Sequence, residues 1–426
     1  MEFDAAEDAA DARAAARASR SAAARAIRPL WNQVYFPNLL LSSGQGAMIP
    51  VLVYAARDLH ASTAAAGAVV ALNGLGTMLF DLPAGRVVSR LGEQRAAAFA
   101  AALMAFGLSA CLLANSVALL AFGVFVQAAG AAVWILVRLT HLSRVAPAIA
   151  RGRALSLFGG IIRAGSVIGP FLFVAVGSRH DVRPAFAIAL VAVVVAYAWQ
   201  RATLGQGDAE GRRRSEPHSF RRLVRTHRRG LLTAGAGALA VSLLRGSRTA
   251  IVPLWATHIG LSSSAAAELY AWSSLVDLAL FYPAGAASDR YGRRAVVLPC
   301  IVLLAAGHVL VPFTHSFDTL FLASFVLAVG NGLGAGIVMT LGADLAPEDG
   351  RASFLALWRA VADGGMTAGP LIDSGVVALA SLALAGPVVA GLGLLGAVVV
   401  ALFLREPAPG RLVRARGRNL ALEENL

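Results

Sequence analysis

Lysine is absent from this chain, and cysteine and charged residues are scarce. All 37 basic residues are arginines, and only 14% of the 426 residues are charged, whereas 58% are hydrophobic. A soluble protein of this length needs more charge to cover its surface, so the composition predicts a polytopic membrane protein. The two cysteines, Cys111 and Cys300, lie in apolar runs, which excludes a disulfide framework and a CxxC metal site.

Several catalytic motifs are also absent. The chain has no HExxH and no GxxxxGKS/T motif, and no Ser-His or Asp-Asp arrangement stands out at matched depth. These absences argue against an intramembrane enzyme and against ATP-driven transport. We therefore expect neither enzymatic activity nor a cofactor or bound metal.

The net charge of +13 raises the question of nucleic-acid binding. The densest basic cluster, RRRSEPHSFRRLVRTHRRG at 212–230, lies between two apolar runs and contains a single aromatic residue. Nucleic-acid sites need stacking platforms, whereas basic loops between spans mark the cytoplasmic side. We expect no nucleic-acid partner.

Apolar stretches long enough to cross ~30 Å of hydrocarbon recur along the chain. We predict twelve helices, at 32–55, 64–88, 95–114, 117–143, 154–177, 184–203, 230–257, 265–287, 295–314, 318–343, 352–373 and 380–404. They divide the chain into a cytoplasmic tail (1–30), a six-helix bundle (31–203), a basic linker (204–229), a second six-helix bundle (230–404) and a cytoplasmic tail (405–426). The fold class is therefore an all-α polytopic membrane protein.

Arginine is distributed unevenly among the loops. Segments 86–95, 144–153, 201–229 and 289–294 hold most of the loop arginines. The positive-inside rule places these segments and both termini in the cytoplasm. We expect a multi-pass protein of the plasma (inner) membrane.

The two halves repeat one another at an offset of 200 residues. FDLPAGRVVSRLGEQR at 80–95 matches FYPAGAASDRYGRR at 281–294, GSVIGP at 165–170 matches GMTAGP at 365–370, and Pro147 matches Pro347. Several landmarks at one offset predict two parallel, pseudo-symmetric repeats of six helices each.

The repeated loop resembles the signature G-x-x-x-D/S-R-x-G of the major facilitator superfamily. The residues that carry this resemblance are Gly85, Arg90, Gly92, Gly285, Asp289, Arg290, Gly292, Arg293 and Arg294. The first copy departs from the pattern, with Ser89 in place of an Asp and Glu93 in place of a basic residue. The resemblance implies two bundles that move by alternating access, with these loops locking and releasing them. GSVIGP also resembles the G-x-x-x-G-P element of many antiporters of that superfamily.

Ionisable residues at bilayer depth need a partner or a water-filled cavity. Our candidates for gating and proton coupling are Asp81, Arg163, Asp277, Arg359 and Asp363. In the family, helix 2 faces helix 11 and helix 5 faces helix 8, which implies the pairs Asp81–Arg359 and Asp277–Arg163. The alternative is that Arg359 pairs with Asp363 on its own helix and leaves Asp81 to Arg86 or Arg90.

Helices 1 and 7 line the central cavity in the family. The candidates for the substrate cavity are Asn38, Gln45, Arg138, Arg245 and Arg248. Alternatively, these groups hydrogen-bond neighbouring helices.

The leading hypothesis is a secondary transporter that moves a small organic solute by alternating access, as a proton-coupled efflux antiporter for a drug or metabolite. The expected partners are this small molecule, protons and the lipid bilayer, and we expect a monomer. The alternatives are proton-coupled uptake of an organic anion, favoured by the arginines, and a non-transporting membrane sensor.

Overall fold

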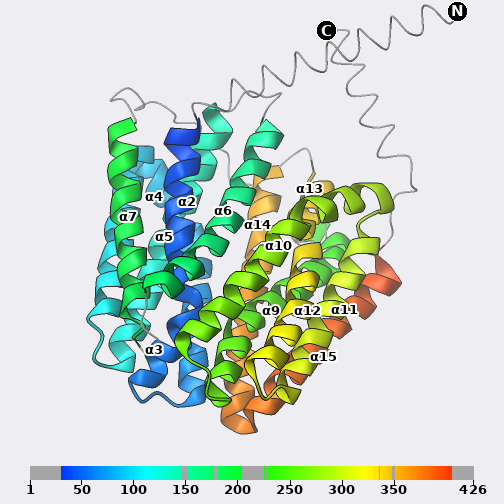
Figure 1. Cartoon of the computed structure of the whole chain (residues 1–426). Coiled ribbons are helices and arrows are strands. Elements are labelled where there is room, and N and C mark those ends of the chain that lie inside the picture. Colours follow the sequence, from blue (N-terminus) through cyan, green and yellow to red (C-terminus); the bar gives the residue numbers. More distant parts are fainter. Residues whose placement is uncertain are drawn as a thin grey trace, which may run out of the picture.

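A computed structural model describes residues 30–145, 151–176, 181–203, 225–226, 228–334, 336–347 and 351–404 of the protein. Every secondary-structure element in these residues is helical, which confirms the predicted all-α class (Figure 1). The expected tails and almost all of the expected linker lie outside the described residues.

The first half contains six membrane crossings. The first crossing is a chain of short elements, η1 (Trp31–Tyr35), α2 (Phe36–Met48), η2 (Ile49–Val51) and α3 (Leu52–Asp58), and it is followed by α4 (Thr63–Leu112), α5 (Val117–Val145), α6 (Arg151–Val176) and α7 (Arg183–Thr203). The long α4 combines the predicted helices 2 and 3, which are separated where Gly92 has a φ of 75°. A positive φ ends a right-handed helix and is tolerated by glycine, because glycine has no Cβ.

The second half repeats this order. It consists of α9 (Arg228–His258), α10 (Ser263–Tyr291), α11 (Arg294–Leu310), η4 (Val311–Phe313), α12 (Phe317–Leu333), α13 (Ile337–Leu345), α14 (Arg351–Leu379) and α15 (Leu382–Phe403). The predicted helix 318–343 is divided into α12 and α13, because α12 ends at Gly334 in the glycine-rich run GNGLGAG.

Ten helical stretches of the described chain are long and apolar enough to span a membrane. Helices α10 and α14, each of 29 residues, complete the expected twelve crossings. Their charged residues, among them Asp277 in α10 and Arg359 and Asp363 in α14, make these two helices less hydrophobic than the rest. Asp277 and Arg359 each form an ion pair with a neighbouring helix, and Asp363 pairs with Arg359 on its own helix.

The 200-residue repeat is visible in the backbone. Gly292 has a φ of 93°, as its counterpart Gly92 has a φ of 75°. At the other end of the same helices, the hydroxyls of Ser62 and Ser262 accept hydrogen bonds from the third backbone N–H beyond them, and so cap the helix starts. We call the membrane face with the Gly92 and Gly292 turns the motif face, and the other the opposite face.

Glycines allow the helices within each half to pack closely. A Cβ on Gly169 would collide with the α2 backbone at Ser43 and Ala47, and one on Gly369 with the α9 backbone at Leu243 and Ser247. Because lipid is as apolar as a protein core, close backbone contact between small residues is a main source of stability in membrane bundles. The GSVIGP and GMTAGP motifs thus have the same packing role in both halves.

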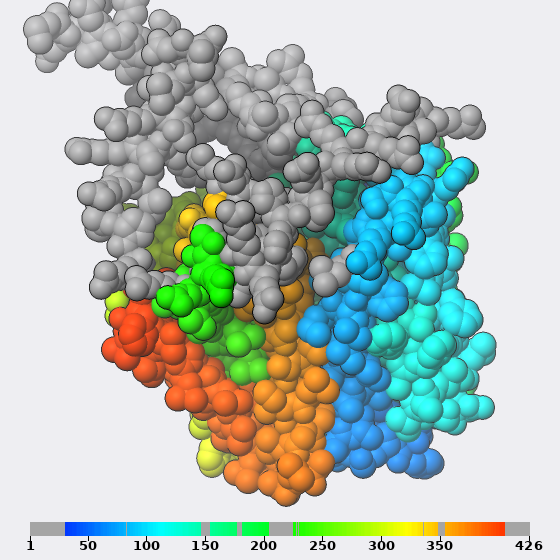
Figure 2. Space-filling model, turned by 180° about the vertical axis from the view of Figure 1, so that it is seen from behind, coloured from blue at the N-terminus to red at the C-terminus, as the bar shows by residue number. Residues whose placement is uncertain are grey.

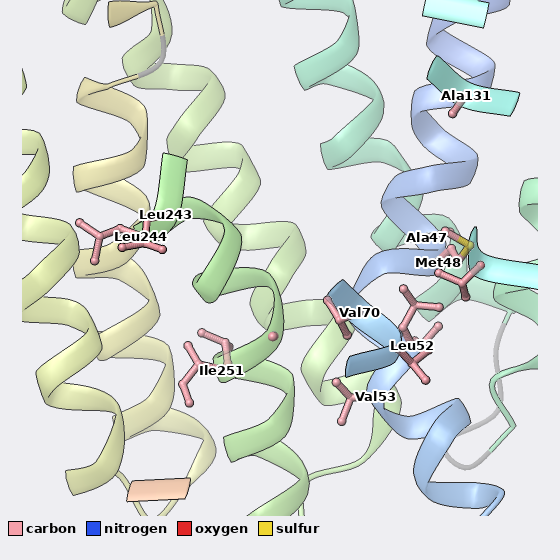
Figure 3. Packing of buried hydrophobic residues seen from close by; sticks show 14 of the residues in the cluster. Ala47, Met48, Leu52, Val53, Val70, Ala131, Leu243, Leu244 and Ile251 are labelled. Carbon is pink, nitrogen blue, oxygen red and sulfur yellow. The ribbon is translucent and has the colours of Figure 1, made fainter. Parts of the chain in front are cut away.

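The apolar core runs through both halves (Figure 3). In this view, Ala47, Met48 and Leu52 of the first crossing pack near Val70 of α4, and Leu243 and Leu244 extend from α9. All of these side chains are buried. Many core positions are alanine, which keeps the helices close to one another.

The two halves meet along two helix pairs, α4 with α14 and α6 with α10. Figure 2 shows residues of α4 (blue) and α14 (orange) side by side on one face of the molecule. These contacts confirm the expectation that helix 2 faces helix 11 and helix 5 faces helix 8. Near the opposite face, the Tyr54 hydroxyl also donates a hydrogen bond to the Leu261 carbonyl, at 3.0 Å.

Candidate functional site

The contact between α4 and α14 contains an ionic bridge between the two halves. Arg359 Nη2 lies 3.5 Å from Asp81 Oδ1, and Arg359 Nε lies 3.3 Å from Asp363 Oδ2 on the same helix. The structure therefore contains both predicted contacts of Arg359 at once, because its guanidinium is shared by two carboxylates. Neither Arg86 nor Arg90 is the partner that the structure gives to Asp81 in an ion pair.

The Asp81–Arg359 bridge is one of several contacts between α4 and α14. Along α4 towards the motif face, Gly67 lies against Ser374 and Gly74 lies against Thr367, before Asp81 meets Arg359. The glycines bring the two backbones together, which places the charged side chains at a distance they can span. About a fifth of the Asp81 side chain and a third of the Arg359 side chain are exposed, so solvent weakens the attraction.

A second cluster lies inside the second half. Arg248 Nη1 of α9 lies 3.0 Å from Asp277 Oδ2 of α10, and the same oxygen accepts a hydrogen bond of 2.6 Å from Asn331 Nδ2 of α12. Arg245 donates a hydrogen bond to the Asn331 carbonyl, at 2.8 Å. Because Arg248 and Asp277 are both buried, removing one would leave the other as an uncompensated charge, which costs ~3–5 kcal/mol.

The expected partner of Asp277 was Arg163, and the ion pair that the structure shows is with Arg248. The Arg163 guanidinium lies 5.1 Å from the centre of the Phe281 ring, at the contact between α6 and α10, and it interacts electrostatically with Asp277, Arg245 and Arg248. Three arginines thus lie around one aspartate. The direct pair Asp277–Arg163 stays a prediction.

Arg138 is placed differently from the other cavity candidates. It is buried in α5, where it donates hydrogen bonds to the Gln33 carbonyl, at 3.1 Å, and to Gln200 Oε1, and it lies 4.4 Å from the centre of the Trp134 ring. These partners all belong to the first half. This arrangement favours the alternative in which Arg138 ties neighbouring helices together.

The two remaining candidates from the first half, Asn38 and Gln45, lie on α2. Asn38 is buried, and its Nδ2 has no hydrogen-bond partner among the described residues. Gln45 is half-buried on the same helix. An unpaired buried amide is available to a ligand, so Asn38 stays a candidate for the substrate cavity.

The repeated loop motif forms an ion pair in each half. In the first half, Glu93 Oε2 lies 2.9 Å from His141 Nδ1 and 2.7 Å from Arg144 Nη2. Glu93 departs from the family pattern, and its pairing with the end of α5 was not predicted from the sequence. The separation of 51 residues between Glu93 and Arg144 recurs in the second half, and this was the signal that could have found it.

In the second half, Arg293 Nε lies 2.9 Å from Asp344 Oδ2 and Nη1 lies 2.9 Å from Asp289 Oδ1. Partial burial by itself lowers the pKa of Arg293, but hydrogen bonds to the two carboxylates outweigh this effect and hold the pKa above its ordinary value. Arg293 therefore links the turn to the end of α13.

The other motif residues lie in exposed positions. Arg90, Arg290 and Arg294 are exposed, and the Arg290 guanidinium lies 5.3 Å from the centre of the Tyr291 ring. A Cβ at Gly85 or Gly285 would meet no described atom within 4 Å. Close helix approach is therefore not the role of these two glycines, although it is the role of the glycines in GSVIGP and GMTAGP.

No group of three or more His, Cys, Asp or Glu side chains in the described part of the chain could hold a metal ion. The chemistry that the structure offers consists of charge pairing between helices, buried arginines and half-buried carboxylates. Two helical repeats that meet along two helix pairs, with charges at their contact, are typical of secondary transporters.

The sequence profile of the Major Facilitator Superfamily matches residues 34–244 and again residues 234–422. The chain belongs to this superfamily. It is accordingly a membrane transporter and not an enzyme. A search of curated proteins gave no match.

Solved structures share the fold at low sequence identity. A POT family transporter in complex with a thioalcohol-conjugated peptide is 11% identical, with a TM-score of 0.75 over 88% of this chain and 96% of that chain. A nucleoside transporter mutant is 12% identical, with a TM-score of 0.73 over 88% and 99%. A D-xylose–proton symporter is 17% identical, with a TM-score of 0.66 over 87% and 97%.

Proposed function

We propose that the protein exports a small organic solute, a drug or a metabolite, in exchange for protons by alternating access. The observation that carries this proposal is the Asp81–Arg359 bridge, because it joins the two repeats through one acid and one base. Protonation of Asp81 would remove one partner and weaken the contact, which couples a proton to the separation of the halves.

The proposal includes a location and an orientation. The motif face is the cytoplasmic face, because the loop arginines concentrate there, and the membrane is the plasma membrane. The protein works as a monomer, since each chain contains both repeats that alternating access requires. The structure then corresponds to a state that is closed at the opposite, external face, where Tyr54 meets Leu261.

A second candidate is proton-coupled uptake of an organic anion. Arg163, Arg245 and Arg248 surround Asp277, so this part of the molecule has an excess of positive charge. An anionic group bound there would balance that excess. One solved structure of the same fold is a D-xylose–proton symporter, which supports proton coupling in this second candidate function.

Flux measurements decide among these functions. The purified protein is screened for small molecules that raise its melting temperature, and hits are tested in proteoliposomes with a pH gradient imposed in each direction. Accumulation driven by the gradient supports transport, and its sign separates export from uptake. Binding without saturable flux would instead support the sensor alternative.

Cysteine labelling tests alternating access directly. Tyr54 and Leu254 are 8% and 1% exposed at the outer ends of the first and seventh crossings. Tyr54→Cys and Leu254→Cys should react slowly with a maleimide, and faster when the ligand shifts the protein to the state open at this face. Leu113→Cys, at a position 74% exposed, is the control that should react fast throughout.

The two native cysteines, Cys111 and Cys300, are buried and contribute little background. Labelling that is unchanged by a ligand with verified flux would contradict alternating access.

A further inference from the structure

A buried polar cluster in the second half has no part in the bridge or in the Arg248–Asp277 pair. It consists of Ser247 on α9, His308 on α11 and Asp373 on α14, and each of these residues is 0% exposed. His308 Nε2 lies 3.1 Å from Ser247 Oγ, and His308 Nδ1 lies 2.7 Å from the Leu304 carbonyl oxygen. Helix α14 packs closely on α9 here, because a Cβ on Gly369 would lie 2.4 Å from the Ser247 backbone nitrogen. Asp373 follows one turn further along α14, and its carboxyl group lies beside the Ser247 hydroxyl.

The hydrogen-bond partners fix where the hydrogens are. The Leu304 carbonyl can only accept, so His308 Nδ1 carries a hydrogen. If His308 is neutral, its Nε2 is an acceptor and takes the single hydrogen of Ser247. The Ser247 oxygen is then left as an acceptor, and the group beside it that could donate is Asp373 in its protonated form.

The energetics of burial lead to the same protonated acid. Neither oxygen of Asp373 forms a hydrogen bond of good geometry with the described residues, so its contact with the neighbouring Ser247 hydroxyl is a weak one. An ionised carboxylate in this position would cost several kcal/mol, because it is fully buried and no cation of the described residues forms an ion pair with it. The neighbouring cation on α9, Arg248, already forms an ion pair with Asp277.

The surroundings contain few other groups that titrate. Arg245 and Arg248 lie on α9 near Ser247, and Tyr270 and Asp277 of α10 interact with Arg248. Residues 63–80 of α4 and the whole of α15 contain no titratable side chain. The proton shared by the three residues is therefore governed by the cluster itself and by the adjacent Arg248–Asp277 pair.

We propose that Asp373, Ser247 and His308 form a proton-binding site that holds one exchangeable proton. In one state the proton is on Asp373 and His308 is neutral. In the other, the Asp373 O–H bond breaks, Ser247 takes up that proton as it gives its own to His308 Nε2, and the products are a carboxylate and an imidazolium. That this proton is the coupling ion rests on the transport function proposed above.

Infrared spectroscopy of the purified full-length protein tests the site without any substrate. A protonated carboxyl group has a C=O stretching band that shifts to lower frequency in D2O. We expect this band at neutral pH in the wild type and its loss in Asp373→Asn. Asp318→Asn is the matched control, since Asp318 is exposed at the start of α12 and its replacement should leave the band unchanged.

A second variant tests the relay through the serine. In Ser247→Ala, Asp373 keeps its proton and loses the hydroxyl that lies beside its O–H group, so the band should persist and shift to higher frequency. If Asp373→Asn fails to fold, this variant decides by itself: an unshifted band overturns the site. Identical spectra of wild type and folded Asp373→Asn also overturn it.

The role of this proton in coupling can be tested separately from the existence of the proton-binding site. Transport that is indifferent to a pH gradient would refute the proposed function and leave the infrared result standing. Gradient-driven transport that is retained in Asp373→Asn would show that the coupling proton binds elsewhere.

Discussion

The two loop-motif turns of this transporter form the same contact with opposite charges. In the first half the acid is on the turn, at Glu93, and the base is Arg144 at the end of α5. In the second half the base is on the turn, at Arg293, and the acid is Asp344 at the end of α13. At the 200-residue offset, Glu93 corresponds to Arg293 and Arg144 corresponds to Asp344. The charge is reversed at both positions, so each half still has one acid and one base.

This difference shows that the repeat preserves an ion pair and not the identity of a residue. Two positions that depend on each other can exchange their charges if they change together, because the attraction is symmetric. The second half adds Asp289 to its pair, and the first half adds His141 instead. Both halves therefore contain the ion pair between the turn and the end of a helix, and they differ in the third residue that contacts it.

The largest effect is expected where the halves touch. Asp81→Arg would place a second cation beside Arg359 and should remove most of the transport, by roughly tenfold or more, since each ~1.4 kcal/mol changes a rate tenfold. Asp81→Arg with Arg359→Asp should restore part of it. Transport rates in proteoliposomes, at equal amounts of reconstituted protein, measure this.

The Arg359→Asp single variant is the matched control, because it measures the effect of the charge change at Arg359 alone. A folded double variant that is no faster than either single variant would disprove the bridge as a functional contact.

The next comparison concerns packing, in which the halves are expected to be equal. Gly169→Ala and Gly369→Ala both push a methyl group into the backbone of the helix opposite. Each should cost ~1–3 kcal/mol of stability. Melting temperatures of the two purified variants should fall by similar amounts, and Gly85→Ala, in open space, should change little. If the melting temperature fell in only one of the two variants, the two motifs would not have the same packing role.

The reversed pair allows a smaller and more specific test. Glu93→Arg would place a cation beside Arg144 and His141, and transport should fall about fivefold, equivalent to ~1 kcal/mol. Glu93→Arg with Arg144→Asp gives the first half the polarity of the second and should recover most of the rate. Initial transport rates of the two variants and of the wild type decide this.

Failure of the double variant, with normal folding, would mean that the first half requires its own charge order, for instance through His141.

The smallest effect is expected at Ser89 and Asp289, which occupy corresponding positions of the repeat but are different residues. Asp289 accepts a charge-assisted hydrogen bond from Arg293, whereas the Ser89 hydroxyl donates to the carbonyl of Arg86. Because more than half of the Asp289 side chain is exposed, Asp289→Asn should slow transport about twofold. Ser89→Ala should leave the rate unchanged. Equal effects at matched expression would remove this asymmetry.

The sequence by itself determined the helical membrane fold, the repeat and the positions of the turns. Long apolar runs give the membrane helices, and the glycines at 92 and 292 give the turns, because both are local signals. The 200-residue offset is a long-range pattern, and it gives the repeat. The helix contacts that carry Asp81 and Arg359 were also predictable, because family resemblance gives the order of the helices around the axis.

Only the tertiary structure decided which polar side chains meet. The structure pairs Asp277 with Arg248, whereas the pair Asp277–Arg163 stays a prediction. The partners Asn331 and Arg144 were not predicted from the sequence. The reason is physical. A membrane helix is apolar on all sides, so its sequence does not reveal how it is rotated, and that rotation decides which polar side chain faces which.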